Sequence, residues 1–136
     1  MIGRLGLLLG FVLLSGGSAL AADKSNLAVD NAIPNIPGKS ILAVVVDYPP
    51  GARNAPHHHA PSAFVTAYVL EGAVRSQVDD GPAKVYRTGE YFTENPGAHH
   101  RISENASKTE PARFLVFIVK DKGAPVTRPV AAEELR

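Results

Sequence analysis

The histidines of this sequence are the residues whose type and spacing could do chemistry. His57, His58 and His59 are consecutive, and His99 and His100 form a second group further along the chain. Each group lies beside a turn that contains proline or glycine. Neutral imidazole is a common ligand of zinc, copper, iron and nickel. The two groups could therefore bind one transition-metal ion if the fold brings them together; otherwise they are solvated loop histidines.

The direction of these side chains depends on the local secondary structure. On an extended strand, alternate side chains share a face. His57 and His59 would then point together into a barrel, while His58 points outward. By the same rule His99 and His100 face opposite ways, so only one of them can join the first pair. The spacing predicts three imidazoles from two strands and leaves the choice between His99 and His100 open.

Short segments of β type, separated by glycine and proline turns, surround the histidines. They are rich in β-branched and aromatic residues or alternate between apolar and polar side chains. The expected strands cover residues 41–46, 64–70, 73–78, 85–87, 91–93, 100–103 and 114–119. No amphipathic helix is evident, although residues 131–136 could form a helical turn. This pattern predicts a single all-β domain, either a barrel or a sandwich.

The first histidine group has a recognisable framework around it. Five residues separate Gly51 from His57, and His59 completes a His-x-His pattern. Residues 68–72 have the sequence Tyr-Val-Leu-Glu-Gly. Here the sequence resembles the cupin superfamily, whose fold is a small antiparallel barrel with two metal-binding motifs. The glycine, the His-x-His pattern and the strand end are those of the first motif.

The second histidine group resembles the second cupin motif. Seven residues separate Gly89 from Gly97, and two more separate Gly97 from His100, as in the family. Asn105 matches the family asparagine, one position late. The resemblance covers residues 41–119, which is nearly all of the expected folded part.

The resemblance implies both a fold and a site. The fold is a small antiparallel cupin β-barrel, of the double-stranded β-helix or jelly-roll type, over residues 40–120. The metal ligands are His57, His59 and His100, so the resemblance favours His100 over His99. The cofactor is a divalent transition metal, which could be iron, manganese, nickel, copper or zinc.

One family residue is missing from its usual place. Many metal-binding cupins use a glutamate as a fourth ligand, expected here at Val65 or at its neighbour Phe64, and no acid occurs from Ala60 to Leu70. We interpret Glu71 as a turn residue at the end of a hairpin. The resemblance therefore implies a neutral set of three histidines. Such a site would bind hard ions such as manganese more weakly and leave positions open for water, oxygen or substrate.

Other residues near the motifs receive more ordinary interpretations. Gln77 could point into the cavity or outward, with no preference. Tyr68, Phe92 and Phe114 are expected to be core or cavity wall. His99 is expected to face solvent. No residue is assigned a catalytic role.

Three functions follow from this reading. Three-histidine cupins occur among iron dioxygenases, so the resemblance favours a metal-dependent oxygenase-type enzyme acting on a small organic molecule. The alternative is a non-catalytic cupin that binds a small ligand or a metal, because nothing in the motif replaces the glutamate as a general base. A barrel without metal ranks third.

A homodimer, formed through an exposed strand such as residues 41–46, is a further expectation from the family.

The first 21 residues have the composition of an export signal. Arg4 precedes an apolar run over residues 5–14, and small residues lead to Ala19-Leu20-Ala21. The run is shorter than the roughly 20 residues that a membrane span needs. We therefore expect cleavage near Ala21 and a periplasmic or secreted protein without a stable membrane anchor. We interpret residues 22–39 as a flexible lead-in and residues 121–136 as a polar C-terminal tail.

The charge balance excludes one class of partner. Of the 14 basic residues, Arg4 alone lies in the expected signal peptide, which leaves 13 basic and 13 acidic side chains. Such a chain has no electrostatic reason to bind nucleic acid, and we expect a small-molecule ligand or substrate instead. The sequence has no cysteine, so the fold does not depend on disulfides.

Overall fold

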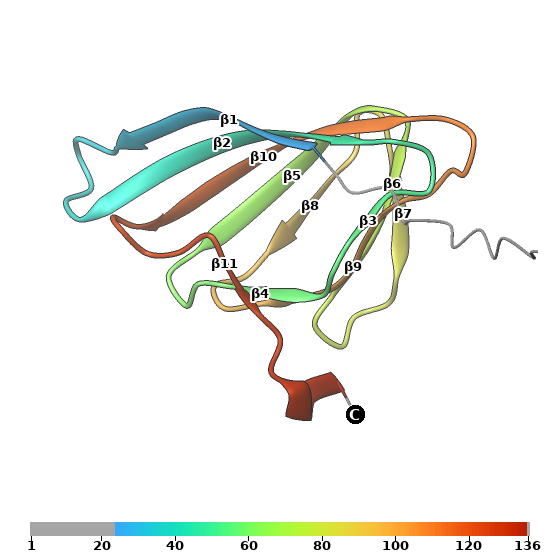
Figure 1. Cartoon of the computed structure of the whole chain (residues 1–136). Coiled ribbons are helices and arrows are strands. Elements are labelled where there is room, and N and C mark those ends of the chain that lie inside the picture. Colours follow the sequence, from blue (N-terminus) through green and yellow to red (C-terminus); the bar gives the residue numbers. More distant parts are fainter. Residues whose placement is uncertain (1–23, 136) are drawn as a thin grey trace, which may run out of the picture.

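A computed structural model describes residues 24–135; the expected signal peptide over residues 1–21 lies outside this range. Two antiparallel sheets face each other in this part of the chain (Figure 1). The strands are β1 (Lys24–Ala32), β2 (Lys39–Tyr48), β3 (Arg53–Asn54), β4 (His57–His59), β5 (Phe64–Glu71), β6 (Ala73–Val78), β7 (Lys84–Arg87), β8 (Tyr91–Glu94), β9 (His99–Asn105), β10 (Ala112–Asp121) and β11 (Thr127–Pro129). A short 3-10 helix, η1 (Ala132–Leu135), ends the described chain, as the expected helical turn predicted. Within residues 24–135, no helix is long and apolar enough to cross a membrane.

The strand order confirms the predicted antiparallel β-barrel. One sheet has the order β1-β2-β10-β5-β8, and the other has the order β11-β4-β9-β6-β7, with β3 also paired to β9. The chain crosses from the first sheet to the second at Gly72, between β5 and β6. Gly72 has a φ of +70°, and a Cβ atom there would overlap the carbonyl oxygen of Pro111. Only glycine fits this crossing without strain.

The two sheets bury the alternate side chains of their strands. On β5, Val65, Ala67 and Val69 are buried, whereas Phe64, Tyr68 and Leu70, which alternate with them, are exposed. The interior forms two apolar clusters of buried residues, the first made of Val46, Tyr48, Ala52, Ala67, Val69, Val74, Phe92, Ala112 and Phe114, and the second of Leu42, Ala60, Ala63, Val65 and Ile118. The period of two in the sequence therefore marks the inner face correctly. Tyr68 follows the same alternation and lies on the outer face, so its expected place in the core or cavity wall is wrong.

Asn105 holds β9 against the loop that leads to the first histidine group. Its buried side-chain amide donates hydrogen bonds to the carbonyl oxygens of Tyr48, Pro49 and Glu110, at 3.2, 3.1 and 2.8 Å. Its own carbonyl oxygen accepts from the backbone N–H of Ser107 at 2.8 Å. One side chain thus bonds to two backbone segments, residues 48–49 and residues 107–110, which places β9 relative to the end of β2.

The segment expected to be a flexible lead-in differs from that expectation. Residues 24–32 form β1, which pairs with β2 along its length, with an irregularity between Leu27 and Val29. Its side chains are exposed or only partly buried, so backbone hydrogen bonds hold it rather than side-chain burial. Pairing of this kind leaves little hydrophobic signature in a sequence, which is why the strand was missed.

The presence of β1 also changes the expectation for a dimer, because it covers the strand that was expected to be an exposed edge. Residues 41–46 lie in β2, between β1 and β10, and do not form an edge of the sheet. Exposed apolar side chains gather instead on the outer face of that sheet, on Phe64, Tyr68, Leu70, Tyr91 and Phe117. A homodimer stays a prediction.

Candidate metal centre

Strands β4 and β9 bring the two histidine groups together. They pair in antiparallel register, with His57 opposite His100 and His58 opposite His99. On the inner face, His57, His59 and His100 each offer a ligand atom, and these atoms lie within 4.8 Å of one another. The structure therefore selects His100 rather than His99 as the third member and brings the three predicted ligands into one cluster.

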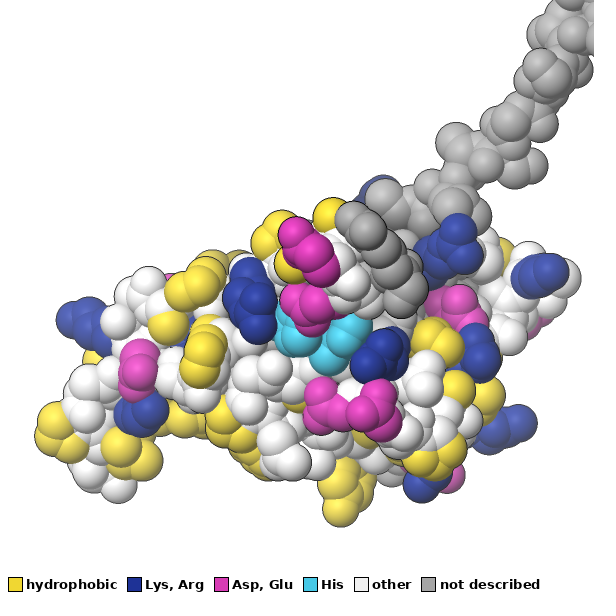
Figure 2. Space-filling view, turned by 90° about the horizontal axis from the view of Figure 1, so that it is seen from below, with side chains coloured by type: hydrophobic (Ala, Val, Ile, Leu, Met, Phe, Trp, Pro, Cys, Tyr) yellow, Lys and Arg dark blue, Asp and Glu magenta, His cyan; other side chains and the backbone are white. Residues whose placement is uncertain are grey.

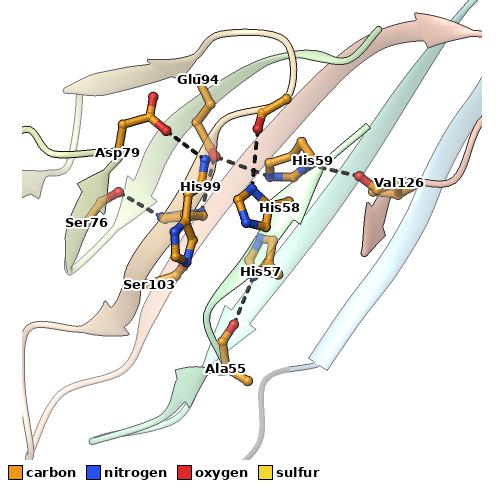
Figure 3. A network of polar contacts seen from close by, with 12 residues as sticks. Ala55, His57, His58, His59, Ser76, Asp79, Glu94, His99, Ser103 and Val126 are labelled. Carbon is orange, nitrogen blue, oxygen red and sulfur yellow. Dashed lines mark hydrogen bonds and ion pairs between the residues drawn. The ribbon is translucent and has the colours of Figure 1, made fainter. Parts of the chain in front are cut away.

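Backbone carbonyl groups orient two of the three rings (Figure 3). His57 Nδ1 lies 2.9 Å from the carbonyl oxygen of Ala55, and His59 Nδ1 lies 3.0 Å from that of Val126. A carbonyl oxygen only accepts, so each Nδ1 carries the proton and Nε2 is the nitrogen left for a metal. Val126 precedes β11, in the part of the chain expected to be a peripheral tail.

The third ring, that of His100, is held from two sides. Its Nε2 lies 2.8 Å from the hydroxyl oxygen of Ser76 on β6. Its Nδ1 lies 3.2 Å from Oε1 of Glu94, on β8. The ring is 4 % exposed, so these two groups rather than solvent set its orientation.

Glu94 supplies a carboxylate that the sequence interpretation lacked. Its other oxygen, Oε2, lies 3.3 Å from His59 Nε2, and the residue is only 2 % exposed (Figure 3). Oε2 is close enough for an ion pair but lacks hydrogen-bond geometry, so it has no hydrogen bond within the described residues. The three histidines still form the cluster whose ligand atoms lie within 4.8 Å of one another, but a buried acid that the sequence interpretation did not include lies between two of them.

The position of Glu94 explains the missing family residue. Glu94 on β8 pairs directly with Val65 on β5, one of the two residues, with Phe64, at which the glutamate was expected. Directly opposed residues of antiparallel strands share a face, with Cβ atoms about 5 Å apart. The carboxylate has thus moved to the neighbouring strand while still reaching the same part of the interior.

The charges of the metal-free site are coupled. Burial alone would raise the pKa of the Glu94 carboxyl, but the His100 and His59 rings beside it outweigh burial and hold that pKa at about 2. Burial likewise works to lower the pKa of His59, yet the Glu94 carboxylate raises it. Burial lowers the pKa of His57. The carboxylate is therefore ionised and favours the protonated form of His59, whereas burial favours the neutral form of His57, which is the form that binds a metal.

These residues fit a divalent transition-metal ion. Three imidazoles and one carboxylate are nitrogen and oxygen donors of the kind that iron, manganese, nickel, copper and zinc accept. The buried Glu94 oxygen without a hydrogen bond would gain a partner from a cation. Coordination through Nε2 of His59 requires this nitrogen to be deprotonated.

The cluster lies on the wall of a large cavity between the sheets. The cavity has a volume of about 730 Å³. Its apolar lining includes Leu42, Val44, Val46, Val65, Phe92, Phe114, Val116 and Ile118. Phe92 and Phe114 are therefore cavity wall, as expected. Gln77 does not line this cavity, because its amide donates to the carbonyl oxygen of Gly81 in the turn after β6.

The sequence reasoning missed two features of this region. Glu94 could have been found from Phe92, because residues two apart on a strand share a face and Phe92 was expected to point inward. His99 was expected to face solvent, but it is 8 % exposed and lies against His58. Burial and the neighbouring His58 lower the pKa of His99.

Two facing antiparallel sheets with a histidine cluster and a carboxylate on an inner wall define a barrel able to hold a metal ion. The sequence profile described as Cupin domain matches residues 44–118, which is more than half of the chain. The chain belongs to the cupin family. None of the curated proteins matches this sequence.

Solved structures share this fold at low sequence identity. A Klebsiella pneumoniae protein with a double-stranded β-helix domain is 21 % identical, with a TM-score of 0.61, over 79 % of this chain and 84 % of that one. A cupin 2 conserved barrel protein from Rhodopseudomonas palustris is 16 % identical, with a TM-score of 0.62, over 83 % and 70 %. An oxalate oxidase in complex with the substrate analogue glycolate is 24 % identical, with a TM-score of 0.55, over 70 % and 54 %. These similarities concern the fold.

Proposed function

We propose that this protein is an exported, metal-dependent cupin enzyme of the oxygenase type, acting on a small organic molecule. Its ligands would be His57, His59, His100 and, in addition to the sequence prediction, Glu94. The observation that carries the proposal is the Glu94 carboxylate, buried between His59 and His100 and facing the same cavity. The two histidines beside it keep this acid ionised despite its burial, and its Oε2 has no hydrogen bond within residues 24–135, so the carboxylate is available to a cation.

The Glu94 carboxylate changes both the metal ions that the site is expected to bind and the balance between an enzyme and a non-catalytic cupin. It offsets one of the two positive charges of a divalent ion, so the expected weakness toward hard ions such as manganese no longer follows. It also removes the reason for preferring a non-catalytic cupin, since an ionised acid now lies at the site as a possible proton acceptor. A bound divalent ion would supply Lewis-acid polarisation of a substrate oxygen and open coordination positions.

The cavity suggests how the chain's own residues would hold a substrate. Polar groups concentrate on the histidine wall, while Val44, Phe92 and Phe114 belong to the apolar lining. A substrate would therefore place its oxygen atoms toward the histidines and its apolar part against these side chains. The apolar walls also limit access of water. Glycolate, the ligand of the oxalate oxidase relative, is much smaller than this cavity, which favours a substrate with an apolar body.

The test combines metal content with turnover. Purified protein is loaded in turn with iron, manganese, nickel, copper and zinc, and oxygen consumption is followed with diketones, thiols, flavonoids and small hydroxy acids. We expect turnover with one metal, and a loss of at least about 10-fold in metal affinity for Glu94→Gln. Glu71→Gln is the matched control, because Glu71 is exposed at the end of β5. Metal binding that is unchanged in Glu94→Gln would remove Glu94 from the site.

The alternative function, a non-catalytic cupin that binds a small ligand or a metal, predicts a different result in the same assays. A ligand that raises the melting temperature without any product, across all five metals, would replace the enzyme proposal by a non-catalytic one. A wild-type protein that retains no metal after loading would contradict both.

A further inference from the structure

The outer face of β4 and β9 carries a second histidine pair. His58 and His99 oppose each other directly, one position along from the inner pair, and their side chains lie on the opposite face. Their rings stack with centroids 4.4 Å apart and an angle of 29° between the ring planes. Glu134, from η1 at the C-terminal end, places Oε2 at 2.8 Å from His58 Nε2. The ligand atoms of these three residues lie within 4.8 Å of one another.

The two histidines of this outer cluster are buried although they lie outside the barrel, and Glu134 is exposed. His58 and His99 are each 8 % exposed. Nε2 of His99 is buried and has no hydrogen-bond partner within residues 24–135. A buried polar nitrogen without a partner costs folding free energy. A cation shared with His58 and Glu134 would give this nitrogen the partner that it lacks.

We propose that His58, His99 and Glu134 form a second metal site, which binds zinc, nickel or copper(II) on the outer face of the barrel. Two imidazoles and one carboxylate are a donor set that these borderline ions prefer. His58 Nδ1 lies 3.4 Å from the carbonyl oxygen of Gly97, which would fix the ring with Nε2 toward the ion. This site shares strands with the inner centre but no residue, so it goes beyond the proposed function.

The charges around the outer cluster are mixed. Figure 2 shows histidine side chains on this face between acidic and basic ones. The hydrogen bond to His58 above all, and to a smaller extent Arg128, lower the pKa of Glu134, whereas burial and His58 lead the lowering of the pKa of His99, to which Arg101 adds and which Asp79 opposes. Because charges of both signs surround the cluster, we expect coordination by the three residues rather than general surface charge to supply the affinity.

The site would fasten the C-terminal segment to the barrel. η1 lies below β4 in Figure 1, after β11, whose three residues pair with β4. The same segment carries the Val126 carbonyl that orients His59 on the inner face. An ion bridging Glu134 to His58 and His99 would therefore hold the segment that positions one inner ligand.

The experiment counts zinc ions per chain. Mature protein and its variants are dialysed against zinc and analysed for metal, and affinities are measured by titration calorimetry. We expect two ions per chain in the wild type and one in Glu134→Gln. Glu133→Gln, which changes the adjacent exposed glutamate of the same short helix, should keep two. His57→Ala, which disables the inner centre, should keep the outer ion and lose the inner one.

Other outcomes separate the two sites. If Glu134→Gln keeps both ions with unchanged affinities, the outer site is overturned. One ion in the wild type and none in His57→Ala would also overturn it, while leaving the proposed function intact. One ion in the wild type that survives His57→Ala but is lost in Glu134→Gln would support the outer site and contradict the inner one. As a second readout, zinc should slow proteolysis of residues 127–135 in the wild type and in Glu133→Gln, but not in Glu134→Gln.

Discussion

Glu94 and Val65 stand directly opposite each other on paired strands, and both line the cavity that holds the histidines. The resemblance to the family motif places the carboxylate at Val65 or its neighbour Phe64, whereas in this protein the strand that faces Val65 carries one. The exchange is possible because a cross-strand pair shares one face of the sheet. The same relationship suggests that the two positions are interchangeable as sources of a metal-binding acid.

That suggestion gives the first prediction. Glu94→Val should lower the affinity for the inner metal at least about 10-fold, because it removes a buried charged ligand. Adding Val65→Glu to that variant should restore most of the metal affinity, because the side chain of residue 65 lies on the same inner face as that of Glu94. Thr66→Glu in place of Val65→Glu is the control, because Thr66 is adjacent but faces outward. Equal recovery with both second changes, measured by calorimetry, would contradict the exchange.

The metal-free protein should show a defined pH dependence of stability. The pKa of Glu94 falls from 4.5 to about 2 on folding, and each unit corresponds to about 1.4 kcal/mol. The carboxylate therefore adds about 3 kcal/mol above pH 4.5, and this is lost as the pH falls toward 2. The pKa of His59 is raised above 6.5, so its contribution is present below pH 6.5 and is lost as the pH rises through the raised value.

Urea unfolding of chelator-treated protein from pH 2 to 9 measures this profile. The difference between wild type and Glu94→Gln should be largest between about pH 4.5 and 6.5 and should shrink on both sides. Glu71→Gln should follow the wild type throughout. A difference that stays constant with pH would mean that Glu94 stabilises the fold by packing and not through its charge.

Much of the fold follows from the sequence because the inner faces of the strands obey a simple alternation. His57 and His59 point inward and His58 outward, as a period of two requires. The choice of His100 over His99 needed the second motif, and the register of β4 with β9 explains it. The alternation of side chains between the two faces of one strand can be read from the sequence.

Relationships between strands are not visible in the same way. Nothing near Glu94 indicates that it lies opposite Val65, because the two are joined only by the pairing of β5 with β8. The pairing of β1 with β2 depends on backbone groups that every residue has. The contact of Glu134 with His58 joins residues 76 positions apart, through a segment whose polar composition indicated only a tail. These features follow from topology rather than from local pattern.

Export is the next prediction. Residues 1–21 have a positive start, a short apolar run and a small-residue end, which is how a cleavable signal is built. Protein recovered from the periplasm or the medium should begin at Ala22, as measured by intact mass. Replacing Leu8 and Leu9 by arginine should retain the uncleaved chain inside the cell, because the apolar run is interrupted. Recovery of the full-length chain in the cytosol of cells that make the unaltered sequence would contradict export.

The crossing at Gly72 gives the last prediction. Gly72→Ala places a Cβ atom against the Pro111 carbonyl at a positive φ, so both overlap and backbone strain destabilise the fold. Gly89→Ala is a matched control, since Gly89 has a φ of +90° but open space around it. We expect Gly89→Ala to cost about 1 kcal/mol of unfolding free energy and Gly72→Ala clearly more, by urea denaturation. Gly72 joins the sheet that carries Glu94 to the sheet that carries the histidines. Gly72→Ala should therefore also weaken metal binding at the inner site, whereas Gly89→Ala should not. If the two changes had equal effects on stability and on metal affinity, the special role of Gly72 at the crossing would be contradicted.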